Sequence, residues 1–169
     1  MSIPSSHMQP APRVTGSMLF SFVRCPHRPV MDAYGPQDRK DPPNEFVNLL
    51  WECGSAHEAQ IAESLVGAIN LRDLAPEQRE VATLAALDRK VPMVYSGRLR
   101  DPLTGEVGEP DLLKLHPLGG YVPGDIKSGG SLDEEGQPAM RPEYVVQIGH
   151  YLKLLAALGR AAPGARTGF

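Results

Sequence analysis

The sequence has few cysteines, no long apolar run and no strong excess of either charge. Only two cysteines occur among 169 residues, which excludes the disulfide framework of a small secreted protein. No apolar run approaches the roughly 20 residues that span a bilayer. The start of the chain also lacks the basic and apolar regions of a signal peptide. These absences predict a cytoplasmic protein without a membrane partner.

Neither sign of charge is in large excess. The 17 Lys and Arg residues and the 20 Asp and Glu residues give a formal net charge of -3. The overall electrostatic field therefore does not favour a polyanionic partner, and any contact with nucleic acid has to depend on a local basic surface. The candidates for such phosphate contacts are Arg98, Arg100, Lys114 and Arg141.

What the sequence does contain is enough for one domain with a hydrophobic core, since 41% of its residues are hydrophobic and 22% are charged. Both ends are rich in Pro and small residues. We therefore expect a flexible tail over residues 1–16 and a single domain over residues 17–160. Residues 161–169 are expected to be a second flexible tail or a point of truncation.

The stretch of residues 42–69 predicts a first helix, because Asn44 can cap it and apolar residues recur every three or four positions. This apolar stripe consists of Phe46, Leu50, Cys53, His57, Ile61 and Leu65. The stripe should face whatever the helix packs against, and Gly54 in mid-helix suggests close packing. Two further helices should begin at Pro76 and Pro142, the second of them ending at Gly159.

Three strand candidates lie between the second and the last predicted helix, over residues 91–99, 109–116 and 121–129. The turns between them are short, which predicts an antiparallel meander. We therefore predict a mixed α/β fold in which helices flank a small mixed sheet with this meander at its centre.

Two of these strands carry acids in segments that otherwise look buried, although strand interiors are depleted in Asp. Asp111 lies in "GEPDLL" and Asp125 in "GDIKSG". Because side chains alternate along a strand, Asp125 and Lys127 should project from the same face. If the strands pair through "PLGG", Asp111 comes alongside Asp125. Two such carboxylates need a cation, and Mg²⁺ held beside Lys127 would equip a site for hydrolysis of a phosphodiester.

With "GSAHE" on the first helix and "QIGHY" on the last, these two motifs form an ordered set. The chain resembles the RecB-like branch of the PD-(D/E)XK nuclease superfamily, which includes recombination nucleases and CRISPR-adaptation exonucleases. The resemblance implies a restriction-endonuclease-like core and a Mg²⁺- or Mn²⁺-dependent deoxyribonuclease. It favours an exonuclease that acts on single-stranded DNA or duplex ends in repair, recombination or CRISPR adaptation. Asp125 stands where many relatives have Glu.

The resemblance also implies roles for single residues. The implied metal ligands are His57, Asp111, Asp125 and the backbone carbonyl of Ile126. Lys127 would be the catalytic lysine that acts with the two aspartates. Gln147 and Tyr151 lie four positions apart and hence on one helical face, and they would lie near the substrate strand. Relatives with a [4Fe–4S] cluster have a cysteine at the place of Cys25. Since no cysteine follows Cys53 and four thiolates are needed, we expect no cluster in this chain.

Several residues have structural alternatives that the sequence leaves open. His57 can be an ordinary core histidine, and Gln147 and Tyr151 can be a partly buried polar pair. Glu109 alternates onto the face of Asp111 and can assist it. Two further residues, His150 and Lys153, either contact phosphates or belong to a solvated helix face.

Two other classes of function also stay open. A nucleic-acid-binding or assembly module can keep the same fold without catalysis. A small-molecule phosphohydrolase is the second, although the sequence contains no glycine-rich phosphate-binding loop of the kind such enzymes use. The binding or assembly module is distinguished from a nuclease by whether the acids bind metal and whether DNA is cut.

Overall fold

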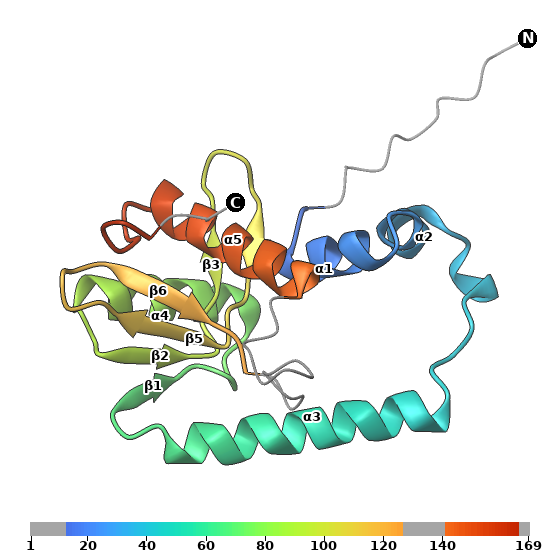
Figure 1. Cartoon of the computed structure of the whole chain (residues 1–169), viewed down its shortest axis with the longest axis horizontal. Coiled ribbons are helices and arrows are strands. Elements are labelled where there is room, and N and C mark those ends of the chain that lie inside the picture. The colour runs from blue at the N-terminus through green and yellow to red at the C-terminus, as the bar shows by residue number, and fades with distance from the viewer. Residues whose placement is uncertain (1–12, 127–140, 166–169) are drawn as a thin grey trace, which may run out of the picture.

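Helices lie on both sides of a small sheet, as Figure 1 shows. The computed structural model describes residues 13–126 and 141–165. Its helices are α1 (Gly16–Arg24), α2 (His27–Tyr34), α3 (Glu45–Ser64), α4 (Pro76–Asp88) and α5 (Pro142–Ala157), with a short 3-10 helix η1 (Gln37–Arg39). Its strands are β1 (Ala68–Asn70), β2 (Met93–Tyr95), β3 (Leu99–Arg100), β4 (Val107–Gly108), β5 (Leu112–Leu115) and β6 (Tyr121–Gly124). The mixed α/β class is therefore as predicted.

The main sheet has the strand order β1-β2-β5-β6. Strands β2, β5 and β6 pair antiparallel and form the predicted meander. Strand β1 pairs parallel to β2 at one edge, and β3 and β4 form a separate antiparallel pair. The turn between β5 and β6 contains Gly119 and Gly120 at φ values of 90° and 70°, a region that glycine enters without steric cost. This turn sets the register of the two strands that carry the acids.

The hydrophobic core lies on the face of the sheet that carries Val94 and Leu113, both of which are fully buried. Leu87 of α4 and Leu154 of α5 belong to the same cluster. Both helices are therefore held to the sheet by the removal of apolar surface from water. Alternation along β5 directs Lys114 to the opposite face, where it is exposed.

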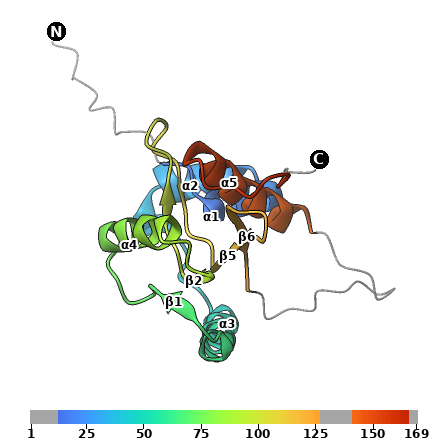
Figure 2. The same ribbon diagram turned by 90° about the vertical axis from the view of Figure 1, so that its left-hand side faces the viewer.

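Helix α3 has the predicted cap, since the Asn44 side chain accepts a hydrogen bond of 2.9 Å from the Val47 N–H. The predicted burial of its stripe is wrong within the described residues. No residue of α3 is buried, and Phe46 and Leu50 are 67% and 53% exposed. The prediction of close packing at Gly54 is also wrong, because no described atom outside the helix lies within 4 Å of a Cβ built there. Figures 1 and 2 show why: α3 runs apart from α1 and α5, on the other side of the sheet.

The fold extends beyond the predicted domain of residues 17–160 at both ends. The Val107 N–H donates to the Val14 carbonyl at 3.0 Å, and the Thr15 side chain caps α1. At the other end, the N–H of the buried Ala162 donates to the Tyr121 carbonyl at 3.0 Å. Residues 13–16 and 161–165 thus satisfy backbone groups of the strands instead of lying in tails. Within the two described ranges, every helix is too short or too polar to cross a bilayer.

Candidate functional site

Asp111 and Asp125 lie opposite each other where β5 begins and β6 ends. The register pairs Leu112 with Gly124, so the next pair outward is Asp111 and Asp125. Opposed residues of an antiparallel pair project from the same face. Asp111 also shares its face with Leu113, two positions along, and this is the side of the hydrophobic core. The structure therefore brings the two predicted acids together, partly buried, at the edge of the core.

The carboxyl of Asp111 holds its proton more tightly than usual. Burial is the main cause that raises the pKa of Asp111 from 3.8 to about 7, and the hydrogen bond and charge of Asp125 act in the same direction. The Ile126 N–H opposes this by donating to Asp111 Oδ2 at 2.6 Å, which favours the carboxylate. Asp111 is therefore partly protonated near neutral pH, and a divalent cation can take the place of its proton.

Helix α5 places Gln147 and Tyr151 beside the acid pair. Gln147 Nε2 donates to the Tyr151 hydroxyl at 2.9 Å. Tyr151 is 3% exposed, and burial followed by the negative charges of Asp125 and Asp111 raises the pKa of Tyr151 above its usual value of 10. The hydroxyl therefore keeps its proton and can donate a hydrogen bond to an anion, but it cannot act as a base at physiological pH.

Two glycines make room for the ring of Tyr151. A Cβ on Gly16 of α1 would lie 2.8 Å from the Tyr151 hydroxyl oxygen, and a Cβ on Gly108 of β4 would lie 2.7 Å from its Cδ1. A larger residue at either position would have to displace a well-packed ring. Helix α1 and strand β4 thus fix Tyr151 in place, a contribution that the sequence motifs did not indicate.

The other predicted metal ligands differ in their placement. Ile126 directly follows Asp125 and contacts Asp111 through its N–H, whereas Lys127 lies outside the described residues. His57 is partly buried on α3. Among residues 13–126 and 141–165, no group of three or more His, Cys, Asp or Glu side chains is arranged to hold a metal ion. The structure therefore does not bring His57 together with the acid pair.

Glu58, the neighbour of His57, acts on one of the two acids. Glu58 lies with one carboxylate oxygen 3.9 Å from Arg72 Nη2, and Arg72 Nη1 donates to the Tyr95 hydroxyl at 3.1 Å on β2. The charge of Glu58 contributes to the raised pKa of Asp111. Of the motif "GSAHE", the glutamate therefore acts on Asp111 through its charge, and Arg72 separately links this part of α3 to the sheet.

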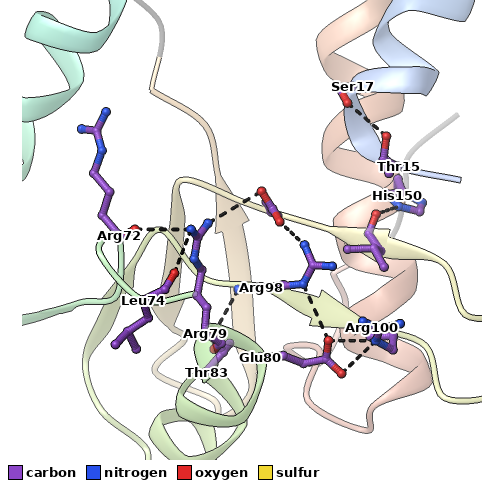
Figure 3. A network of polar contacts seen from close by, with 12 residues as sticks. Thr15, Ser17, Arg72, Leu74, Arg79, Glu80, Thr83, Arg98, Arg100 and His150 are labelled. Atoms are coloured by element: carbon purple, nitrogen blue, oxygen red, sulfur yellow. Dashed lines mark hydrogen bonds and ion pairs between the residues drawn. The ribbon is translucent and has the colours of Figure 1, made fainter. Parts of the chain in front are cut away.

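Figure 3 shows a network of arginine and glutamate side chains. The network adjoins the site at Glu109, whose charge acts on the Tyr151 hydroxyl. Arg98 Nη1 binds the Glu109 carboxylate, and Arg79 Nη1 lies 3.7 Å from the same group. Arg100 Nε donates to both carboxylate oxygens of Glu80, at 2.9 and 2.8 Å. The sequence indicated Arg98 and Arg100 as phosphate contacts and Glu109 as an assisting acid. It did not indicate that Arg98 pairs with Glu109 or that Arg100 pairs with Glu80.

Three other candidates for phosphate contact have structural partners. His150 is buried, and its Nε2 bonds the Val107 carbonyl at 2.9 Å. Lys153 Nζ lies 2.5 Å from Glu106, and the Arg141 guanidinium lies over the Tyr144 ring at 5.9 Å. His150 thus belongs to the packing of α5 against β4 and not to a solvated helix face, because its ring satisfies a buried carbonyl.

No family model, no curated protein and no solved structure matches the chain. Because a mixed α/β fold supports many unrelated activities, the function has to be inferred from the site. The features that bear on it are the acid pair, the fixed and protonated Tyr151, and the arginines beside them.

Proposed function

We propose that this protein is a divalent-metal-dependent deoxyribonuclease with a restriction-endonuclease-like core of the RecB type. The observation that carries the proposal is that Asp111 and Asp125 face each other on neighbouring strands, with the pKa of Asp111 raised to about 7. Partly buried acids held together in this way are typical of metal-dependent active sites. The ordered motifs favour an exonuclease that works in DNA repair, recombination or CRISPR adaptation.

The donor set fits a hard divalent cation. Mg²⁺ is usually bound by one or two carboxylates together with waters and substrate phosphate oxygens, and Asp111 and Asp125 supply two carboxylates. The backbone carbonyl of Ile126 would be a further oxygen ligand. When bound, Mg²⁺ or Mn²⁺ polarises the scissile phosphate and makes a coordinated water more acidic.

The chain's own residues provide the remaining chemistry. Lys127 follows Asp125 by two positions in the sequence, and in this proposal it is the catalytic lysine. It would orient the attacking water and accept its proton, or stabilise charge that develops on the phosphate. The protonated hydroxyl of Tyr151, held by Gln147 at 2.9 Å, can donate to a phosphate oxygen and orient the strand.

Cleavage of end-labelled DNA tests the proposal. In Mg²⁺ or Mn²⁺ the wild-type protein should shorten single-stranded DNA or duplex ends, and Lys127→Ala should lower the rate roughly 10²-fold or more, the usual contribution of a general acid or base. Lys40→Ala is the matched control, because Lys40 is exposed and pairs with Asp32 at 2.7 Å, and it should retain the wild-type rate. Equal cleavage by wild type and Lys127→Ala would rule out this mechanism.

One observation favours the alternative of a nucleic-acid-binding module without catalysis: within the described residues no third His, Cys, Asp or Glu joins the acid pair. Metal binding separates the two possibilities. Saturation with Mg²⁺ at about 100 times Kd should stabilise the wild type by about 2.7 kcal/mol, which for a chain of this size is a rise of roughly 5–10 °C in melting temperature. Asp125→Asn should lose this rise.

Two outcomes of the thermal measurement would contradict the proposal. If Mg²⁺ raises the melting temperatures of wild type and Asp125→Asn equally, the ion binds elsewhere and the acid pair is not a metal site. If the rise depends on Asp125 but no DNA is cut, the protein is the binding module instead.

A further inference from the structure

A cavity of about 350 Å³ opens between the start of α1, strand β4 and helix α5. Its lining includes Arg13, Ser17, Arg98, Glu109, Gln147 and Tyr151. The volume lies within the usual range for small-molecule sites. Tyr151 is common to the cavity and to the acid pair, since the charges of Asp111 and Asp125 act on its hydroxyl. The cavity therefore adjoins the proposed catalytic site.

Positive charge predominates in the lining, with Arg13 and Arg98 against Glu109. The side chain of Arg98 is only 14% exposed, and it is held between Glu109 and the Glu80 carboxylate, 3.7 Å from its Nε (Figure 3). Arg13 is exposed. Guanidinium groups match the geometry of phosphate oxygens and bind them with charge-assisted hydrogen bonds. A preorganised arginine and an accessible one thus make the cavity suitable for a phosphate group.

Two polar atoms of these lining residues are buried without a hydrogen-bond partner among the described residues, Arg98 Nε and Gln147 Oε1. Gln147 already uses its Nε2 on Tyr151, so the amide oxygen is left as an acceptor. Buried polar atoms without partners are uncommon because they lose hydration without compensation. Arg98 Nε faces Glu80 at 3.7 Å, so a phosphate would meet the guanidinium at its other nitrogens. A base or sugar donor of a nucleotide would satisfy the amide oxygen once the Gln147 side chain turns toward the cavity.

We propose that this cavity binds the nucleotide next to the scissile bond, with Arg13 and Arg98 on its phosphate and Gln147 accepting a hydrogen bond from its nucleoside. The inference rests on the proposed function, because it makes the bound nucleotide part of the DNA strand that the acid pair cuts. The same phosphate chemistry would suit a mononucleotide released from the strand, and the experiment has to distinguish these two sources.

Calorimetric titration in EDTA, where no cleavage occurs, tests the site. The wild type should bind a short, terminally phosphorylated oligothymidylate, and Arg13→Gln should weaken Kd about tenfold, as expected for the loss of one charge-assisted contact. Ser17→Asp should weaken it at least as much, because it adds a carboxylate to the lining. Both residues are exposed, so the variants should fold. Arg89→Gln removes an equally exposed charge outside the cavity and should leave Kd within about twofold.

The outcomes separate this inference from the nuclease proposal. Equal affinity of wild type, Arg13→Gln and Ser17→Asp would overturn the nucleotide site and leave the proposal for the acid pair and Lys127 intact. Binding that depends on Arg13 in a protein that cuts no DNA would support the phosphate site and overturn the nuclease. If thymidine monophosphate or inorganic phosphate binds as tightly as the oligonucleotide, with the same loss in Arg13→Gln, the assignment to a strand is overturned in favour of a free phosphate ligand.

Discussion

Asp111→Asn should abolish metal-dependent cleavage and at the same time make the metal-free protein more stable at about pH 8. The activity falls because the pair loses one of its two carboxylates. A bound divalent ion supplies several kcal/mol of transition-state stabilisation, so its loss corresponds to a rate reduction of roughly 10³- to 10⁴-fold. The comparison of wild type and Asp111→Asn in the DNA cleavage assay, each at saturating Mg²⁺, measures this effect.

The gain in stability follows from the raised pKa of Asp111, which is about 7 in the folded protein against 3.8 in the unfolded chain. Between these values the folded state binds more protons, so the free energy of unfolding of the wild type falls as the pH rises through about 7. The stability from this group is fully present below pH 3.8 and is lost above about 7. Asparagine does not titrate, and its amide can still accept from the Ile126 N–H and donate to Asp125.

Urea unfolding of both proteins in EDTA, between about pH 5 and pH 8, tests this linkage. The advantage of Asp111→Asn should grow with pH and reach roughly 1–2 kcal/mol at the upper end, less than the full pKa difference would give because the carboxyl keeps some contact with solvent. Asp88→Asn, which removes an exposed carboxylate that pairs with Arg160 at 2.5 Å, should not make the protein more stable. An advantage for Asp111→Asn that stays constant with pH would mean that the pKa of Asp111 is not raised in the folded protein.

The elements predicted from sequence are those whose signals are local. Asn44 caps α3 through its own side chain, and Pro76 and Pro142 stand in the first turns of α4 and α5. The helices α1 and α2, of 9 and 8 residues, were not predicted. So short a helix presents few turns of apolar periodicity and is stabilised mainly by tertiary packing. The two- and three-residue strands β1, β3 and β4 are too short for alternation to be visible in the same way.

The difference between local signals and tertiary packing also explains which site residues the sequence placed. The acids were placed correctly because alternation and a short turn determine which residues of β5 and β6 oppose each other. The position of His57 depends on how α3 lies against the sheet, and an apolar stripe on a helix does not identify the surface that covers it. The pairing of Arg100 with Glu80 joins residues 20 positions apart, and such a contact leaves no periodic trace in the sequence. Long-range geometry was therefore the part that sequence reasoning could not supply.

Gly108→Ala should destabilise the protein by about 1–3 kcal/mol, the usual cost of an inserted methyl group in a well-packed core. The new Cβ would lie 2.7 Å from Leu154 Cδ1 and 2.7 Å from Tyr151 Cδ1, and both side chains are buried. One of them has to move, and a displaced Tyr151 loses its geometry with Gln147. We therefore expect lower nuclease activity as well as a lower free energy of unfolding in urea.

The control for this variant is Gly54→Ala, a change of the same size where no described atom outside α3 lies within 4 Å of the new Cβ. Because alanine is about 0.5–1 kcal/mol better than glycine inside a helix, this variant should be more stable than the wild type. A second test uses Tyr151→Ala, which removes one of the two clashes of the new methyl group and leaves the one with Leu154. Gly108→Ala should then cost less in the Tyr151→Ala background than in the wild type, since the two positions are in contact and their effects are coupled. Equal costs in both backgrounds would show that Gly108 does not make room for Tyr151, and that the ring beside the acid pair is held in place by other contacts.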